Sequence, residues 1–210
     1  MTDEKLRVLY ADDAIVVLDK PTGMLSVPGR LPQHQDALST RVMARYPQAR
    51  VVHRLDCETS GVMVMALSVE AQRHLNRQFH DRKVTKDYTA ICHGVLAEDE
   101  GEIQLPLIAD WPNRPRQMVD PIRGKPAHTR WQVTQRWPDR TRLALKPITG
   151  RSHQLRVHLL AIGHPILGDS LYGSEASQTM ADRLLLHALA LRFRHPVSGQ
   201  VCRFMTDCPF

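Results

Sequence analysis

The strongest candidate for a reacting group in this sequence is Asp56, in the run His53-Arg54-Leu55-Asp56. Thr59-Ser60-Gly61 follows and is typical of a turn, so the carboxylate stands at the mouth of a turn just before an apolar segment. A carboxylate placed in this way can act as a nucleophile or as a base. It can equally form a structural ion pair with Arg54, and structural ion pairs are commoner than catalytic acids.

A second group of candidates lies in the run Thr149-Gly150-Arg151-Ser152-His153-Gln154-Leu155-Arg156-Val157-His158. Arg151 falls at the start of a helix-like stretch, where backbone N–H groups and a guanidinium would suit a phosphate or a carboxylate. His153 and His158 are five residues apart and do not share a helix face, so the pattern does not favour a metal site. Tyr88, in Lys86-Asp87-Tyr88, is by itself only a tyrosine on an expected strand.

The elements that must position these residues are mostly strands. Periodicity and turn residues predict strands at 6–10, 14–19, 62–67, 86–93, 127–136, 141–146, 184–193 and 200–204. Helices are expected from an Asp36 N-cap to about residue 45, over 69–81 after Ser68, and over 152–162 before Gly163. Residues 101–126 are rich in proline and predict irregular chain with short strands. Because sequence neighbours can pair as hairpins, the pattern favours an α+β fold with a mixed, largely antiparallel sheet.

Length and composition narrow the class of protein. The 210 residues, 42% hydrophobic and 24% charged, are ordinary for a globular protein of one large domain or two small ones. Neither GxGxxG nor GxxxxGK[ST] occurs, so a dinucleotide or P-loop cofactor is not expected. No apolar run approaches the ~20 residues that span a bilayer, and residues 1–5 do not resemble a signal peptide. We therefore expect a cytoplasmic protein without a membrane partner.

The four cysteines are Cys57, Cys92, Cys202 and Cys208, and none forms a CxxC pair. Free thiols in a reducing compartment are the expected state. The sequence leaves a disulfide between Cys202 and Cys208 open.

Positive charge is concentrated in residues 111–158, which we call the basic segment. It holds eleven Lys or Arg and two Asp, a net charge of +9, whereas the whole chain carries +6. A polyanionic partner would explain this distribution, because each neutralised phosphate releases counterions. A solvated basic face without a partner explains it about equally well, and charge alone does not separate RNA from DNA or from an anionic membrane.

Six short motifs, in order and spacing, resemble the ribosomal large-subunit pseudouridine synthases of the A type. They are Lys20-Pro21-Thr22-Gly23, His53-Arg54-Leu55-Asp56 with Thr59-Ser60-Gly61, Lys86-Asp87-Tyr88, Ile148-Thr149-Gly150-Arg151 with His153-Gln154-Leu155-Arg156, Gly163-His164-Pro165-Ile166 with Gly168-Asp169, and Leu186-His187-Ala188. The resemblance implies the pseudouridine synthase catalytic fold with a central cleft. It implies one domain over 1–210 without an N-terminal S4-like domain, and a monomer that needs no cofactor and no metal.

The resemblance also implies residue roles and RNA partners. Asp56 matches the catalytic aspartate, Tyr88 the tyrosine that stacks on the target base, and Arg151 the arginine that pairs with the carboxylate. Arg54 matches an arginine that contacts RNA beside the flipped nucleotide. The other expected RNA contacts are His53, Arg114, Arg116 and Arg156. The expected substrates are 23S rRNA and the anticodon stem-loop of tRNA.

Pseudouridine formation is consistent with the absence of cofactor motifs, because moving uracil from N1 to C5 needs neither redox chemistry nor ATP. Asp56 could attack C1′ or C6, or deprotonate C2′, and the sequence does not choose among these routes. The target base must leave its stack, at a cost of a few kcal/mol. A non-catalytic basic RNA-binding protein of the same fold is the alternative, and the intact set of Asp56, Tyr88 and Arg151 favours the enzyme.

Overall fold

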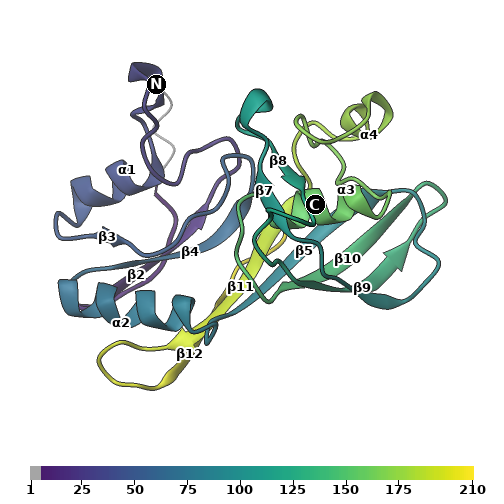
Figure 1. The fold of residues 1–210 in the computed structure, drawn as a ribbon. Coiled ribbons are helices and arrows are strands. Elements are labelled where there is room, and N and C mark those ends of the chain that lie inside the picture. The colour runs from purple at the N-terminus through teal and green to yellow at the C-terminus, as the bar shows by residue number, and fades with distance from the viewer. Residues whose placement is uncertain (1–5) are drawn as a thin grey trace. The chain divides into compact units, whose positions relative to one another are not determined.

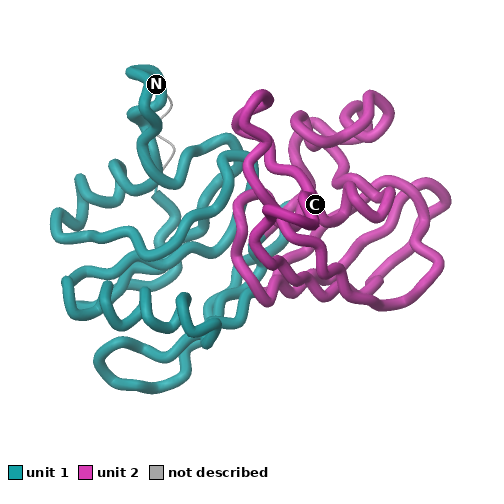
Figure 2. The backbone as a smooth tube through the Cα atoms, viewed as in Figure 1, with its two compact units in different colours: residues 1–86, 188–209 teal, residues 87–187, 210 magenta. Residues whose placement is uncertain are grey.

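The computed structural model describes residues 6–210, so the N-terminal stretch Met1–Lys5 that we inspected for a signal peptide lies outside the described residues. Two compact units make up the chain (Figures 1 and 2). Unit 1 consists of residues 1–86 and 188–209, and unit 2 of residues 87–187 with Phe210. Both boundaries fall inside strands, the first in β5 (Thr85–His93) and the second in β11 (Leu186–Arg194).

The sheet of unit 1 has the strand order β1-β2-β4-β11, with β3 paired to β4 and β12 paired to β11. Its other elements are β1 (Val8–Ala11), β2 (Ile15–Lys20), η1 (Pro32–His34), α1 (Leu38–Arg45), β3 (Arg50–Val51), β4 (Ser60–Ala66), α2 (Val69–His80) and β12 (Val201–Met205). The pairs β1–β2, β2–β4, β3–β4 and β11–β12 are antiparallel. The predicted C-terminal hairpin is confirmed by the β11–β12 pair.

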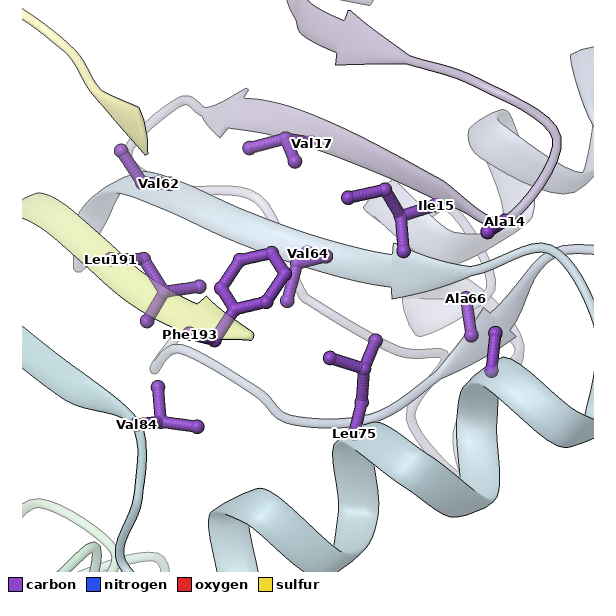
Figure 3. Close-up of a cluster of buried hydrophobic side chains, with 11 residues drawn as sticks. Ala14, Ile15, Val17, Val62, Val64, Ala66, Leu75, Val84, Leu191 and Phe193 are labelled. Atoms are coloured by element: carbon purple, nitrogen blue, oxygen red, sulfur yellow. The ribbon is translucent and has the colours of Figure 1, made fainter. Parts of the chain in front are cut away.

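The core of unit 1 is apolar on both faces of β4. All seven residues of β4 are buried, which confirms the prediction of a fully buried strand. Figure 3 shows Val64 of β4, Ile15 of β2, Phe193 of β11 and Leu75 of α2 directed into one cluster. Helix α2 therefore covers one face of this sheet with its apolar side.

The two long helices of unit 1 begin in different ways. Helix α2 starts as predicted, because the Ser68 hydroxyl accepts a hydrogen bond from the N–H of Ala71 at 3.0 Å. The prediction that Asp36 caps α1 is wrong: the N-cap is Ala37, without a side-chain bond. The Asp36 carboxylate instead binds the Arg41 guanidinium through two contacts of 2.7 and 2.8 Å. A bidentate charged contact thus replaces the expected cap.

The sheet of unit 2 has the order β5-β10-β9-β6, and β7 and β8 form a separate antiparallel pair. Its elements besides β5 are β6 (Glu100–Ile103), β7 (Leu107–Ala109), η2 (Trp111–Asn113), β8 (Gln117–Val119), β9 (Thr129–Arg136), β10 (Arg140–Pro147), α3 (Gln154–Ala161) and α4 (Glu175–Thr179). The predicted hairpin of β9 and β10 is confirmed. Helix α4 was not expected from the sequence, because five residues are too short to show a helical period.

The buried side of unit 2 joins β5, β10 and α3. Leu143 and Leu145 of β10 pack with Ala90 of β5 and with Leu155 and Leu159 of α3. Helix α3 begins at Gln154, two residues later than predicted, because its N-cap His153 has a left-handed backbone with φ of 52°. Arg151 consequently lies in the turn before the helix and not in its first turn.

Two further predictions concern the surroundings of the protein. All four cysteines are free in the described part of the chain, so the disulfide between Cys202 and Cys208 that the sequence left open is not formed. Within residues 6–210, no helix combines the length and the apolar character that a membrane crossing requires.

Gly61 should be intolerant of a side chain. Its φ is +116°, and a Cβ there would collide with the backbone carbonyl of Ala188. We expect Gly61→Ala to lower the free energy of unfolding by about 2–4 kcal/mol, from backbone strain and overpacking together. Urea denaturation measures this change.

The matched control is Gly199→Ala in the turn before β12. Gly199 also has a positive φ, +70°, but a Cβ there meets no atom within 4 Å. Gly199→Ala should lower the free energy of unfolding by only about 1 kcal/mol. Equal losses in the two variants would contradict the close approach of β4 and β11 at Gly61.

Candidate active site

The loop that carries Asp56 is held by a buried lysine at the end of β2. Lys20 is 0% exposed, and its ammonium donates hydrogen bonds to the carbonyls of Pro21, Cys57 and Thr59 at 2.8, 2.8 and 2.9 Å. Three acceptors match the three N–H groups of the ammonium. Because a buried charge is costly without such partners, the loop and the end of β2 fix each other.

Two hydroxyl groups brace the same loop from the chain after β2. Thr22 donates to the carbonyl of Glu58 at 2.7 Å. Ser26 donates to the carbonyl of Leu55 at 2.6 Å and accepts from its N–H at 3.0 Å. The peptides on both sides of Asp56 are therefore fixed, while the Asp56 side chain is only half-buried. Sequence reasoning used Lys20 and Thr22 only as motif residues and gave Ser26 no structural role; a lysine that ends an apolar strand was the available signal.

His53 belongs to the packing of unit 1. Its ring stacks on Phe79, with centroids 4.6 Å apart and planes 24° apart. Its Nε2 accepts a hydrogen bond from the N–H of Val64 at 3.1 Å. Burial, and secondarily the charge of Lys86, lowers the pKa of His53 to about 3. A neutral, stacked imidazole is a poor partner for phosphate, so the predicted RNA contact of His53 has no support in these contacts.

Arg54 differs from the residues on either side of it. The Arg54 side chain is exposed, whereas Leu55 is 7% exposed and tied to Ser26. Within this run the exposed Arg54 therefore stands between two anchoring residues, His53 and Leu55. Arg54 has the exposure that its predicted RNA contact requires.

Tyr88 lies on β5 in unit 2. It stands opposite Leu145 of β10, and its half-buried ring packs against the cluster of Leu143, Leu145 and Leu155. A ring supported in this way presents a fixed flat surface, which suits stacking on a base.

Gln154 organises the turn that contains Arg151. Its Oε1 accepts from the Thr149 hydroxyl at 2.6 Å and from the Arg151 N–H at 3.0 Å. Its Nε2 donates to the carbonyl of His128 and to the hydroxyl of Thr129, both at 2.9 Å. Gln154 is 4% exposed, and sequence reasoning did not single it out. The half-buried Arg151 side chain donates from Nε to the carbonyl of Pro126 at 3.1 Å.

The predicted RNA contact of Arg156 is not supported by the surroundings of its side chain. Arg156 is 2% exposed, and its guanidinium binds both carboxylate oxygens of Asp169, at 2.8 and 2.6 Å. Asp169 is itself fully buried and also accepts from the N–H groups of Leu171 and Tyr172. A guanidinium enclosed in this way is poorly placed to bind the phosphate of a stem-loop.

The basic segment is less available to a polyanion than its net charge suggests. Acidic partners within unit 2 bind six of its side chains: Arg123 with Asp120, Arg130 with Glu102, Arg136 with Asp99, Arg140 with Asp139, Lys146 with Asp87, and Arg156 with Asp169. Arg114 and Arg116 are exposed and, within the described chain, have no carboxylate partner. The predicted RNA contact is thus best supported at these two residues.

The candidate catalytic residues are divided between the units. Asp56 lies in unit 1, whereas Tyr88 and Arg151 lie in unit 2. Each has a braced position within its own unit.

Comparison with known proteins gives a consistent set of relatives. A family model described as RNA pseudouridylate synthase matches residues 14–161. The chain is 54% identical over 206 residues to the dual-specificity RNA pseudouridine synthase RluA of Escherichia coli O6:H1, covering 98% of this chain and 94% of that protein. It is 53% identical over 204 residues to the protein of the same name from Yersinia pestis, covering 97% and 99%.

A solved structure supports the same relationship. The human protein RNA pseudouridylate synthase domain containing 1 superposes with a TM-score of 0.83 at 30% identity, covering 99% of this chain and 85% of that one. This likeness confirms the predicted α+β fold.

Acid should destabilise the protein partly through His53. Below its ordinary pKa of 6.5 the unfolded chain binds a proton at His53, while the folded chain does not until about pH 3, so stability falls as the pH falls through this window. His53→Gln keeps an acceptor for the N–H of Val64. Between pH 7 and pH 4, we expect the free energy of unfolding of this variant to fall by about 2 kcal/mol less than that of the wild type. Urea denaturation at both pH values measures the difference.

The exposed His34 supplies the control. His34→Gln should leave the acid sensitivity of the wild type unchanged. If His53→Gln has the same acid sensitivity as the wild type, His53 is not the group that must stay neutral.

Proposed function

From the premise that this chain belongs to the RNA pseudouridylate synthase family and is an isomerase acting on RNA, we propose that it modifies both ribosomal and transfer RNA. The proposed substrates are a uridine of 23S rRNA and a uridine in the anticodon stem-loop of tRNA. Support comes from the relatives named dual-specificity RNA pseudouridine synthase, which match nearly the whole chain.

Asp56 is the proposed catalytic residue, and the observation that carries this role is the bracing of its loop. Lys20, Thr22 and Ser26 hold the backbone on both sides of Asp56. A carboxylate held before substrate arrives has lost its orientational freedom, which lowers the entropic part of the barrier. It would act as nucleophile at C1′ or C6, or as base at C2′.

We further propose that the two units act as a single catalytic domain over residues 1–210, as a monomer and without cofactor or metal. In this proposal Tyr88 stacks on the uracil of the reacting nucleotide and takes the C5 proton. An arginine of the segment 151–156 pairs with Asp56 and keeps the carboxylate ionised through the reaction.

Two arginines are candidates for this pairing. The family resemblance assigns it to Arg151, which sits in a turn fixed by Gln154. The burial of Arg156 supports it as the second candidate, because a guanidinium shielded from water interacts more strongly with a carboxylate than a half-exposed one does. Asp169 already orients Arg156 with two hydrogen bonds, which would limit the cost of holding it in place.

RNA contacts are proposed for the exposed arginines. Arg54 would fill the gap that the flipped uridine leaves, because it lies two residues before Asp56 and its side chain is exposed. Arg114 and Arg116 would bind phosphates of the loop, giving affinity and register more than base identity.

Asp56→Asn tests the catalytic role. The amide is isosteric but neither nucleophilic nor basic, so pseudouridine formation in both RNAs should fall by a factor of about 10³ or more. RNA affinity should change little. Carbodiimide mapping measures the modification, and a filter-binding assay measures the affinity.

Glu58→Gln is the matched control in the same loop, and it should keep turnover. Normal turnover in Asp56→Asn would refute the catalytic assignment. A wild-type chain that binds these RNAs and modifies neither would support the alternative, a non-catalytic RNA-binding protein.

Lysine variants distinguish the two arginines. When the arginine that holds Asp56 is changed to lysine, the single-turnover rate at saturating RNA should fall and the pH profile of that rate should shift. The reason is that lysine lacks the planar guanidinium fork. Arg151→Lys and Arg156→Lys are compared with Asp169→Asn, which breaks the Arg156–Asp169 pair and leaves the guanidinium. An arginine whose lysine variant keeps the wild-type rate and pH profile is excluded as the partner of Asp56. If Arg156→Lys changes the rate and the pH profile no more than Asp169→Asn does, Arg156 has a structural role only.

A further inference from the structure

The loop between β7 and β8, residues 110–116, exposes a large aromatic side chain. Trp111 is 66% exposed, whereas Trp131 and Trp137 are half-buried. In Figure 1 this loop projects from the end of the β7–β8 pair, away from the other strands of unit 2. An exposed indole at a loop tip offers a large flat surface for a contact outside unit 2.

Hydrogen bonds within the loop hold its conformation. Asp110 and Arg116 close its base, the N–H of Asp110 donating to the carbonyl of Arg116 at 3.0 Å. Inside it, the N–H of Asn113 donates to the carbonyl of Asp110 at 3.1 Å, and the Asn113 amide donates to the Asp110 carboxylate at 3.0 Å. Trp111 is therefore presented on a preorganised turn, which reduces the entropy lost when it binds.

A buried tyrosine anchors the loop to the turn of Arg151. The hydroxyl of Tyr172, which is 4% exposed, accepts from the N–H of Gln117 at 2.7 Å. The same hydroxyl bonds to Nδ1 of His153, also at 2.7 Å. His153 is the N-cap of α3 and follows Arg151 by two residues. The position of the exposed loop is thus tied to a turn that we propose to be catalytic.

The chemistry of the loop fits a nucleic-acid base with its phosphates. The Arg114 guanidinium stacks on the Trp111 ring, 3.0 Å from its centroid, and Arg116 lies 5.4 Å from the centroid of Tyr172. Both arginines are exposed. An indole with guanidinium groups beside it is a platform on which an unpaired base stacks, while the charges meet the phosphates.

We propose that Trp111 stacks on an unpaired base of the RNA loop other than the uridine that reacts, and that Arg114 and Arg116 hold the phosphates beside that base. The inference rests on the proposed RNA substrates and names a second nucleotide that the protein contacts. Tyr88 is assigned to the reacting uracil, so Trp111 serves substrate selection and not the chemical step.

The test compares affinity with chemistry in four chains. Wild type, Trp111→Ala, Trp111→Phe and Trp137→Ala are titrated with a synthetic anticodon stem-loop RNA at constant salt. Trp137 is the control because it is also a tryptophan beside arginines, with Arg140 5.3 Å from its ring centroid. Trp111→Ala should weaken binding about tenfold or more, Trp111→Phe much less, and Trp137→Ala not at all. The single-turnover rate at saturating RNA should be the same in all four.

A second measurement identifies the nucleotide. Each loop nucleotide is replaced in turn by an abasic residue, and binding to wild type and to Trp111→Ala is compared. At one position, distinct from the reacting uridine, the two losses should not add, because both remove the same stack. Tryptophan fluorescence gives an independent signal: RNA should quench wild type more than Trp111→Phe.

The inference is overturned if Trp111→Ala binds as tightly as wild type, if Trp137→Ala loses as much, or if the losses add at every position. If Trp111→Ala does not fold, the same fluorescence quenching in wild type and Trp111→Phe overturns it. These outcomes differ from failure of the proposed function, in which the wild-type chain forms no pseudouridine in either RNA.

Discussion

The position of Asp56 depends on the buried ammonium of Lys20. Three backbone carbonyls, from Pro21, Cys57 and Thr59, surround this charge, and a movement of the loop would leave an N–H of the ammonium without its acceptor. Loss of such a bond in a buried site costs more than a bond on the surface, because water cannot replace it. The end of β2 and the loop before β4 are therefore one rigid support, and Asp56 has its backbone geometry before RNA binds.

The same principle holds in unit 2. Gln154 uses its amide to bind His128, Thr129, Thr149 and Arg151, and it thereby fixes the turn before α3. Tyr172 ties this turn to the β7–β8 loop through a single hydroxyl. In each case a buried polar group, satisfied by several partners, sets the place of a more exposed residue. The residues for which the sequence predicted a role are held by residues to which it assigned none.

What the sequence could predict followed from local interactions. Strand β4 and helix α2 were predicted correctly because a run of buried residues and a Ser68 cap act within a few neighbours. Asp36 failed as a cap because Arg41, five residues on, competes for its carboxylate. Arg156 was expected to contact RNA, a role that requires exposure, but its side chain is buried. Its partner Asp169 lies thirteen residues away across a loop, where no periodicity signals the pairing.

The pairing of the basic segment changes what its charge implies for recognition. A net +9 suggested affinity from many phosphate contacts, but six of its eleven cations are bound to acids within unit 2. Those pairs stabilise strands and turns, and using them for RNA would mean breaking them. In the function that we propose, recognition depends more on the positions of Arg54, Arg114 and Arg116 than on total charge. A few fixed cations select a particular backbone path, whereas a uniform basic face would bind any RNA.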